Sequence, residues 1–125
     1  MKESLKKLMD LLPDDADGAI ITSDLNRRYL TDMKSSAGTL VFTRTAAAFI
    51  IDFRYIEKAR SVITDYPVIL QDGLFTQIAS FFAEQKASRI SIEADTMTMS
   101  EYHSFCEKMP SLTLLSDNRL SDTVN

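Results

Sequence analysis

Histidine and cysteine are the side chains that most often bind metals or act as nucleophiles, and this chain has one of each. His103 and Cys106 are three residues apart, a spacing that places them on the same side of a helix. A zinc site needs three or four such ligands, so this pair alone does not predict one. Cys106 also falls on the apolar side of the expected helix, where the reactive thiolate is disfavoured. We interpret it as a packed structural thiol.

Carboxylates are plentiful, and three of them lie close together in Asp14, Asp15 and Asp17. We interpret this cluster as a solvated turn, because no rigid element is predicted there that would make the oxygens converge on a metal. Neither GxGxxG nor GxxxxGK[ST] occurs, so the sequence predicts no phosphate-binding loop. We therefore predict no catalytic, cofactor-binding or metal-ligating residue in this chain.

Two other segments combine polar, aromatic and charged residues. The first runs from Asn26 to Thr31 and continues into the small polar loop that ends at Gly38, and the second covers residues 51–55. Taken residue by residue, Asp52 would cap a helix, Arg54 would be solvated and Tyr55 would pack on a sheet edge. Gly38 would supply a backbone angle that other residues avoid.

Hydrophobic periodicity predicts the elements that carry these segments. Helices are expected over residues 3–12, over 24–31 with Asp24 as the cap, and over 54–64. Two further helices are expected after an Asp72 cap and after Thr98 and Glu101, which have capping-box spacing. Strands are expected over residues 19–21, 39–43, 47–51, 68–70, 90–93 and 112–115. This order predicts an α/β fold, a single three-layer domain in which helices flank a mixed sheet of about six strands.

Length and charge limit the possible partners. The chain has 125 residues, which suits one domain, and we expect that domain to cover residues 1–115. The net charge is −4 and basic residues do not cluster, so nucleic acid is not an expected partner. The longest apolar run is far shorter than a membrane span needs, and no membrane partner is expected. A single cysteine suits a reducing compartment, and we expect a cytoplasmic protein.

The two segments, in this order, resemble the N-terminal domain of the creatinase, prolidase and Xaa-Pro aminopeptidase family. Members typically read Asn-x-x-Tyr-Leu-Thr-Gly-Phe-x-Gly-Ser-x-Gly, then two strands, then Thr-Asp-x-Arg-Tyr and a helix. The matching residues here are Asn26, Tyr29, Leu30, Thr31, Ser36, Gly38, Asp52, Arg54 and Tyr55. The resemblance covers nearly the whole chain and implies the fold of that domain.

Four positions depart from the pattern. Asp32 and Ser35 replace two glycines, Met33 replaces the aromatic residue, and Ile51 stands where threonine commonly precedes the aspartate. In relatives this loop can approach the active site of the same or a neighbouring subunit. The resemblance thus marks an interface or substrate entrance at Tyr29, Asp32, Met33, Lys34, Ser35 and Ser36, supported structurally by Asn26, Gly38, Asp52, Arg54 and Tyr55. We also expect an exposed apolar patch where Tyr29, Leu30 and Met33 cluster.

The resemblance further implies that catalysis lies outside this chain. Family enzymes hold a pair of divalent metals (Mn, Co or Zn) in a C-terminal "pita-bread" domain, through two Asp, one His and two Glu. The chain would then be a non-catalytic N-terminal domain that assists oligomerisation and shapes the entrance for short peptides, with its own catalytic domain as partner and residues 116–125 as the linker. Two alternatives stay open: a free-standing α/β binding module, and the N-terminal domain of a creatinase-type amidinohydrolase or an inactive relative.

Overall fold

A computed structural model describes residues 2–35 and 37–116, and it builds them around one six-stranded sheet. The strands lie in the order β4-β3-β2-β1-β5-β6. Their bounds are β1 (Gly18–Ile21), β2 (Thr39–Thr43), β3 (Ala47–Ile51), β4 (Val68–Leu70), β5 (Arg89–Ile92) and β6 (Thr113–Leu115). The helices are α1 (Glu3–Asp10), α2 (Asp24–Thr31), α3 (Ile56–Val62), α4 (Leu74–Glu84) and α5 (Met99–Lys108).

Strand direction places both segments of interest at one edge of the sheet. β2 pairs antiparallel with β1 and with β3, whereas the pairs β1–β5, β3–β4 and β5–β6 are parallel. All described strands except β2 therefore point the same way and end at a common edge, which we call the carboxyl edge. The mixed sheet and its β2–β3 hairpin confirm the sequence prediction.

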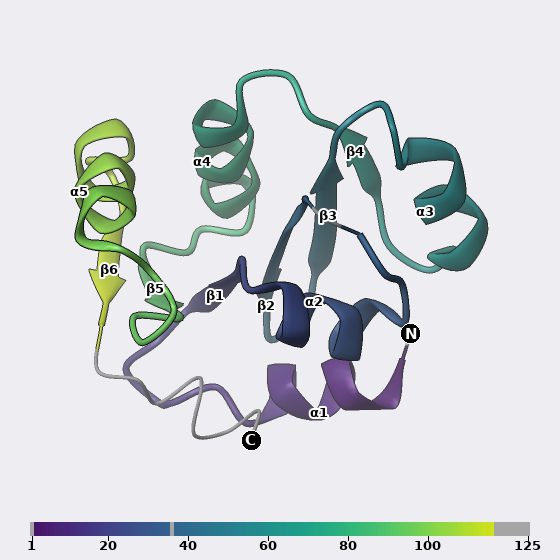
Figure 1. The fold of residues 1–125 in the computed structure, drawn as a ribbon. Helices are drawn as coiled ribbons and strands as arrows, with labels where there is room; N and C mark the ends of the chain where they lie inside the picture. Colours follow the sequence, from purple (N-terminus) through teal and green to yellow (C-terminus); the bar gives the residue numbers. More distant parts are fainter. Residues whose placement is uncertain (1, 36, 117–125) are drawn as a thin grey trace.

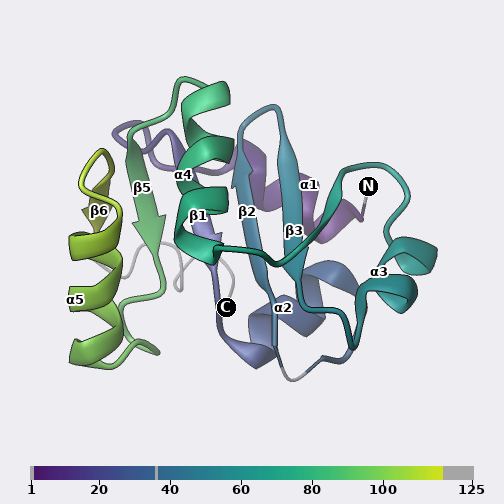
Figure 2. The same cartoon turned by 90° about the horizontal axis from the view of Figure 1, so that it is seen from above.

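Helices cover both faces of the sheet (Figures 1 and 2). α1, α2 and α3 share one core cluster, in which Leu5, Leu30 and Ala59 are buried against strand residues such as Ile21. α4 and α5 contribute to the other cluster, which contains the alternate strand residue Ile20. This alternation is what a strand buried on both faces requires, and it confirms the three-layer α/β domain.

Helix starts agree with the sequence prediction in one case and differ in three. Thr98 and Glu101 form the predicted capping box of α5. α2 is capped by Ser23, whose Oγ accepts a hydrogen bond from the Asn26 backbone N–H at 3.3 Å; the predicted cap, Asp24, is already helical. The Asp72 cap of α4 is wrong as well, because Gly73 begins that helix in the left-handed region at a φ of 77°.

Asp52 is also not a helix cap, and its carboxylate explains why. Oδ1 accepts a hydrogen bond from the Arg54 backbone N–H at 3.0 Å, and Oδ2 accepts one from Arg54 Nη2 at 2.7 Å. The side chain is thus used within the turn that precedes α3, and Tyr55 occupies the cap position. An Asx turn has replaced a helix cap here, since both use the same carboxylate oxygens.

One member of the acidic cluster is structural. Asp17 Oδ2 accepts hydrogen bonds from the backbone N–H groups of Ser88 and Arg89, both at 3.0 Å. These hydrogen bonds are the largest of the effects that lower the Asp17 pKa, with smaller contributions from the charges of Arg44 and Arg89. Residues 14 and 15 form the predicted turn, and Asp17 has an additional structural role because it ties the start of β1 to the start of β5.

Asp17→Asn is expected to lower the free energy of unfolding by about 1 kcal/mol at pH 7, because a neutral amide accepts these hydrogen bonds less strongly. A carboxylate whose pKa is lowered by folding stabilises the fold above its unfolded pKa of about 3.9 and loses that contribution as pH falls through the folded pKa. The difference between variant and wild type should therefore shrink below pH 4. Urea unfolding between pH 3 and pH 7 measures it.

Asp14→Asn is the matched control, since Asp14 is exposed and its side chain makes no hydrogen bond or ion pair with the described residues. A difference between Asp17→Asn and wild type that stays constant down to pH 3, or an equal loss in the control, would contradict the assignment.

Candidate functional site

The two segments singled out from the sequence meet at the carboxyl edge. α2 begins directly after β1, the loop of residues 32–38 leads from α2 into β2, and the turn of residues 52–55 follows β3. Since β1 and β3 flank β2 in the sheet, these three connections are neighbours in space. The juxtaposition is the one a sheet edge commonly uses to build ligand or partner sites in α/β folds.

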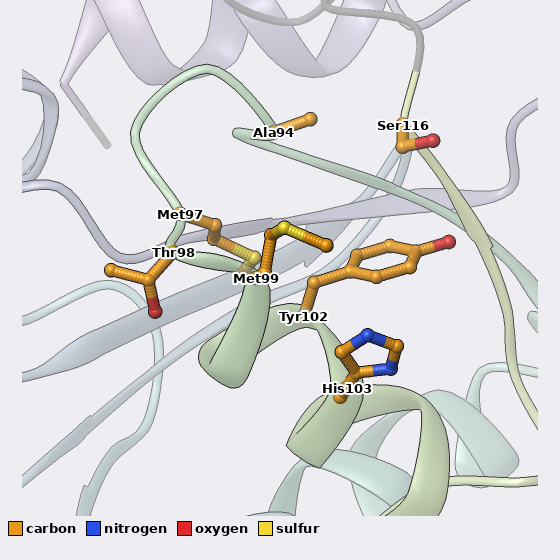
Figure 3. A pocket seen from close by; sticks show the side chains of 7 residues that line it. All are labelled: Ala94, Met97, Thr98, Met99, Tyr102, His103 and Ser116. Carbon is orange, nitrogen blue, oxygen red and sulfur yellow. The ribbon is translucent and has the colours of Figure 1, made fainter.

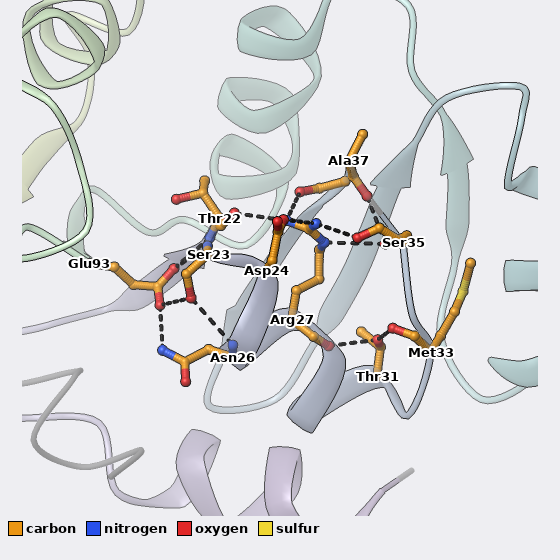
Figure 4. Close-up of polar contacts among 11 residues, drawn as sticks. Thr22, Ser23, Asp24, Asn26, Arg27, Thr31, Met33, Ser35, Ala37 and Glu93 are labelled. Atoms are coloured by element: carbon orange, nitrogen blue, oxygen red, sulfur yellow. Dashed lines mark hydrogen bonds and ion pairs between the residues drawn. The ribbon is translucent and has the colours of Figure 1, made fainter.

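A buried carboxylate holds the first of these connections. Glu93, directly after β5, is fully buried. Its Oε1 accepts hydrogen bonds from the backbone N–H groups of Thr22 and Ser23 at 2.6 and 2.8 Å. Its Oε2 accepts from Ser23 Oγ at 2.7 Å and from Asn26 Nδ2 at 2.5 Å (Figure 4). Asn26 is thus held by Glu93, a partner that the sequence did not reveal.

A buried guanidinium holds the next connection. Arg27 is 2% exposed and reaches from α2 to the loop of residues 32–38. Nη1 donates to the carbonyl oxygens of Thr22 at 2.8 Å and Gly38 at 3.3 Å, and Nη2 donates to that of Ser35 at 2.8 Å (Figure 4). Nη2 also pairs with the carboxylate of Asp24. Sequence reasoning missed this residue, because an Arg next to a second Arg on a short helix is typical of a solvated surface.

Two residues with positive φ define the path of the loop. Gly38 has a φ of 126°, and a Cβ atom there would lie 2.8 Å from Phe49 Cζ, so the expectation of an unusual angle is confirmed. Asp32 adopts a left-handed φ of 62° at the end of α2. Asp32 stands where the family pattern has glycine, and aspartate is among the residues that tolerate this conformation. Its carboxylate also pairs with Lys2 Nζ at 3.2 Å.

The expected apolar patch is not formed. Leu30 and Met33 are 1% and 2% exposed and belong to the core cluster below the sheet, whereas Tyr29 is 53% exposed. Met33 points into the core because the chain reverses at the left-handed Asp32 directly before it. Lys34 is exposed and Ser35 is partly buried. Ser36 lies outside the described residues.

The second segment supports the same edge. Arg54 stacks on the Tyr55 ring, with its guanidinium carbon 5.3 Å from the ring centroid, and it pairs with Asp52. Hydrogen bonding to Arg54 lowers the pKa of Asp52, and hydrogen bonding to Asp52 raises that of Arg54. Tyr55 packs against the core cluster. The turn is thus held by the ion pair between Asp52 and Arg54 and by the packing of Tyr55 on the core.

A cavity of about 630 Å³ joins the two segments. It is bounded by α2, the loop of residues 32–38 and the turn before α3. The residues that line it are Asp24, Leu25, Arg28, Lys34, Ser35 and Tyr55. Of the residues expected at an entrance or interface, this cavity brings together Lys34 and Ser35, next to the support residue Tyr55.

A second cavity, of about 310 Å³, lies at the other end of the same edge (Figure 3). It is lined by Ala94, Met97, Thr98, Met99, Tyr102, His103 and Ser116. His103 is exposed there and its ring packs edge-on near that of Tyr102, at a centroid distance of 6.3 Å. Within residues 2–35 and 37–116, no three His, Cys, Asp or Glu side chains are grouped so as to hold a metal ion. In the same ranges, no helix is long and apolar enough to cross a bilayer.

Arg27→Leu is expected to lower the free energy of unfolding by about 3 kcal/mol, because it leaves three partly buried carbonyl groups without the donor that they share. Arg28→Leu, one position further along α2, is the control: its side chain is exposed and a change there is expected to stay within about 0.5 kcal/mol. Urea unfolding of both variants measures the two values. Equal losses would show that Arg27 does not hold the loop.

Comparison with known proteins identifies a family and relatives that this chain resembles. Residues 3–121 match the model of the creatinase/prolidase N-terminal domain. The chain is 37% identical over 90 residues to the uncharacterized peptidase YqhT of Bacillus subtilis, covering 71% of this chain and 26% of the relative. It is 35% identical over 99 residues to a putative Xaa-Pro aminopeptidase of Mycoplasma genitalium, covering 78% and 28%. The chain thus spans little more than a quarter of these relatives.

Solved structures show the same fold. The Xaa-Pro dipeptidase from Bacillus anthracis has a TM-score of 0.87 at 25% identity, over 98% of this chain and 35% of that one. The N-terminal domain of the cytoplasmic peptidase PepQ from Mycobacterium tuberculosis has a TM-score of 0.86 at 18% identity and matches over the full length of both chains. The chain therefore belongs to the creatinase/prolidase N-terminal domain family.

Proposed function

We propose that this chain is the non-catalytic N-terminal domain of a metal-dependent Xaa-Pro aminopeptidase or dipeptidase. Its role there is to assist oligomerisation and to shape the entrance through which short peptides reach the catalytic domain. One observation carries the proposal: the cavity at the carboxyl edge joins both family segments, and the acidic side chains beside it are already paired with cations. Such a surface suits contact and selection better than proton transfer.

The metals of this reaction would be held elsewhere in a longer protein. A Mn, Co or Zn pair needs several converging carboxylate or imidazole ligands, and the part of the chain that the structure describes groups no three of them. The described residues therefore do not fit such a metal pair. This chain would supply one side of the substrate entrance, in which hydrogen bonds from Arg27 to the carbonyls of Ser35 and Gly38 hold the loop of residues 32–38.

The partners in this proposal are a C-terminal catalytic domain and further copies of the same protein. The length of the relatives supports the first, because this chain matches only 28% of the Mycoplasma genitalium aminopeptidase. The exposed side chains of Tyr29 and Lys34 would make the contacts, with Ser35 beside them. We place the protein in the cytoplasm, which its one cysteine, a free thiol, supports.

The isolated chain, assayed with Mn or Co on Xaa-Pro peptides, is expected to give no turnover above the metal-only blank. A chimera in which this chain replaces the matched segment of the Mycoplasma genitalium relative is expected to cleave short Xaa-Pro peptides and to discriminate against long ones. The same relative with that segment deleted is expected to lose both its oligomeric state and this discrimination. Peptide cleavage by length and sedimentation velocity measure these outcomes.

Chelator-sensitive turnover by the isolated chain would contradict the first expectation. A deleted relative that keeps its oligomeric state and its preference for short peptides would contradict the role in assembly and entrance.

A further inference from the structure

The cavity between α2 and the turn before α3 carries two cations without acidic partners. Arg28 and Lys34 both line it, and the side chain of neither makes a hydrogen bond or ion pair with any residue that the structure describes. The aspartates around it are each paired with another cation: Asp24 with Arg27, Asp32 with Lys2 and Asp52 with Arg54. The cavity is therefore a local site of positive charge on a chain whose net charge is −4.

Apart from Asp24, whose carboxylate is paired with Arg27, the remaining residues that line the cavity are apolar or neutral. Leu25 lines the cavity and is 75% exposed, so its side chain is accessible to an apolar group of a ligand. Tyr55 forms the opposite wall, and its position is set by packing against the core cluster and by the Arg54 guanidinium above its ring. An apolar cavity with a few convergent polar groups is the usual form of a small-ligand site.

The position of the cations is supported from beneath. Arg27, buried under the cavity, donates to the Ser35 carbonyl at 2.8 Å and to Ser35 Oγ at 3.3 Å, which fixes the backbone next to Lys34. Arg28 follows Arg27 on the same helix. A guanidinium can bind both oxygens of a carboxylate, and an ammonium adds a second, less directional charge contact.

We propose that this cavity binds the free C-terminal carboxylate of a short peptide, with Arg28 and Lys34 holding the carboxylate and Leu25 and Tyr55 packing against an apolar last residue. The proposal rests on the proposed function and deepens it, because it names the feature by which the entrance recognises a short substrate. A free carboxylate lies within reach of the entrance only when the peptide is short. Long peptides would present a neutral amide backbone to the same two cations.

The test is a titration of the ¹⁵N-labelled chain, followed by NMR, with acetyl-leucyl-proline and with the same peptide as its C-terminal amide. The acid is expected to shift the backbone signals of Leu25, Lys34 and Ser35 and to saturate in the millimolar range at low salt. The amide is expected to bind about tenfold more weakly, as is typical when one charge-assisted contact is lost. Raising the salt concentration should weaken the binding of the acid more than the binding of the amide, because salt screens the charge contacts.

Arg28→Gln and Lys34→Gln are each expected to weaken binding of the acid several-fold while leaving that of the amide unchanged. Lys58→Gln on α3 is the matched control, because Lys58 is exposed and its side chain makes no hydrogen bond or ion pair with the described residues. The dispersion of the NMR signals without ligand shows whether each variant is folded. If one of the two variants is misfolded, the binding measured with the other variant tests the proposal.

Three results would overturn the proposal: equal binding of acid and amide, shifts confined to other surfaces, or an equal effect of Lys58→Gln. A third peptide, amidated and with an internal glutamate, separates the two sources of a carboxylate. If it binds as tightly as the acid, the site recognises acidic side chains and the assignment to a chain terminus is wrong. Because the titration uses the chain alone, its failure is distinct from a failure of the entrance role, which the chimera tests.

Discussion

Two buried charged side chains, Glu93 and Arg27, hold the turn between β1 and α2, and the rest of the carboxyl edge depends on them. Glu93 accepts hydrogen bonds from the N–H groups of the turn. Arg27 donates to the Thr22 carbonyl in this turn and to the Gly38 carbonyl at the end of the next loop. An unpaired charge in such a place would cost several kcal/mol, so each is stable only with its full set of partners. A network that tolerates one arrangement of donors and acceptors specifies the positions of β1, α2, β2 and β5 together.

The same network determines how the loop of residues 32–38 can act. The loop begins at a left-handed Asp32 and ends at a left-handed Gly38, and Arg27 fixes the backbone between them. Its outward side chain at Lys34 is therefore presented from a held backbone. A contact surface built this way loses little conformational entropy on binding, which is the general advantage of a preorganised site.

The sequence was sufficient where the controlling interactions are local. The α5 capping box and the β2–β3 hairpin each depend on residues a few positions apart, and both were predicted. The cap assigned to Asp52 was wrong because a short acidic side chain can satisfy a turn as well as a helix start. A propensity argument does not separate these two uses, since both leave the backbone turning at the same residues.

The candidate site was predictable only in outline. Glu93 contacts residues that lie 67 to 71 positions earlier, and no spacing rule connects it with Asn26. Met33 was expected in an exposed apolar patch because it lies close to Tyr29 and Leu30 in the sequence. The reversal at Asp32 sends it into the core instead, and that reversal is a backbone event which a side-chain pattern does not reveal.

The residues that carry the family resemblance and those that give the proposed ligand cavity its charge are different residues. Asn26, Leu30 and Thr31 are buried, and they build the turn and the core beneath the edge. Arg28 and Lys34 occupy positions that the family pattern leaves free, yet they give the cavity its charge. The motif therefore identifies the scaffold, while the ligand class depends on side chains that can differ between members with the same fold. Any difference in substrate between this chain and its relatives should accordingly be sought at these free positions before the motif itself.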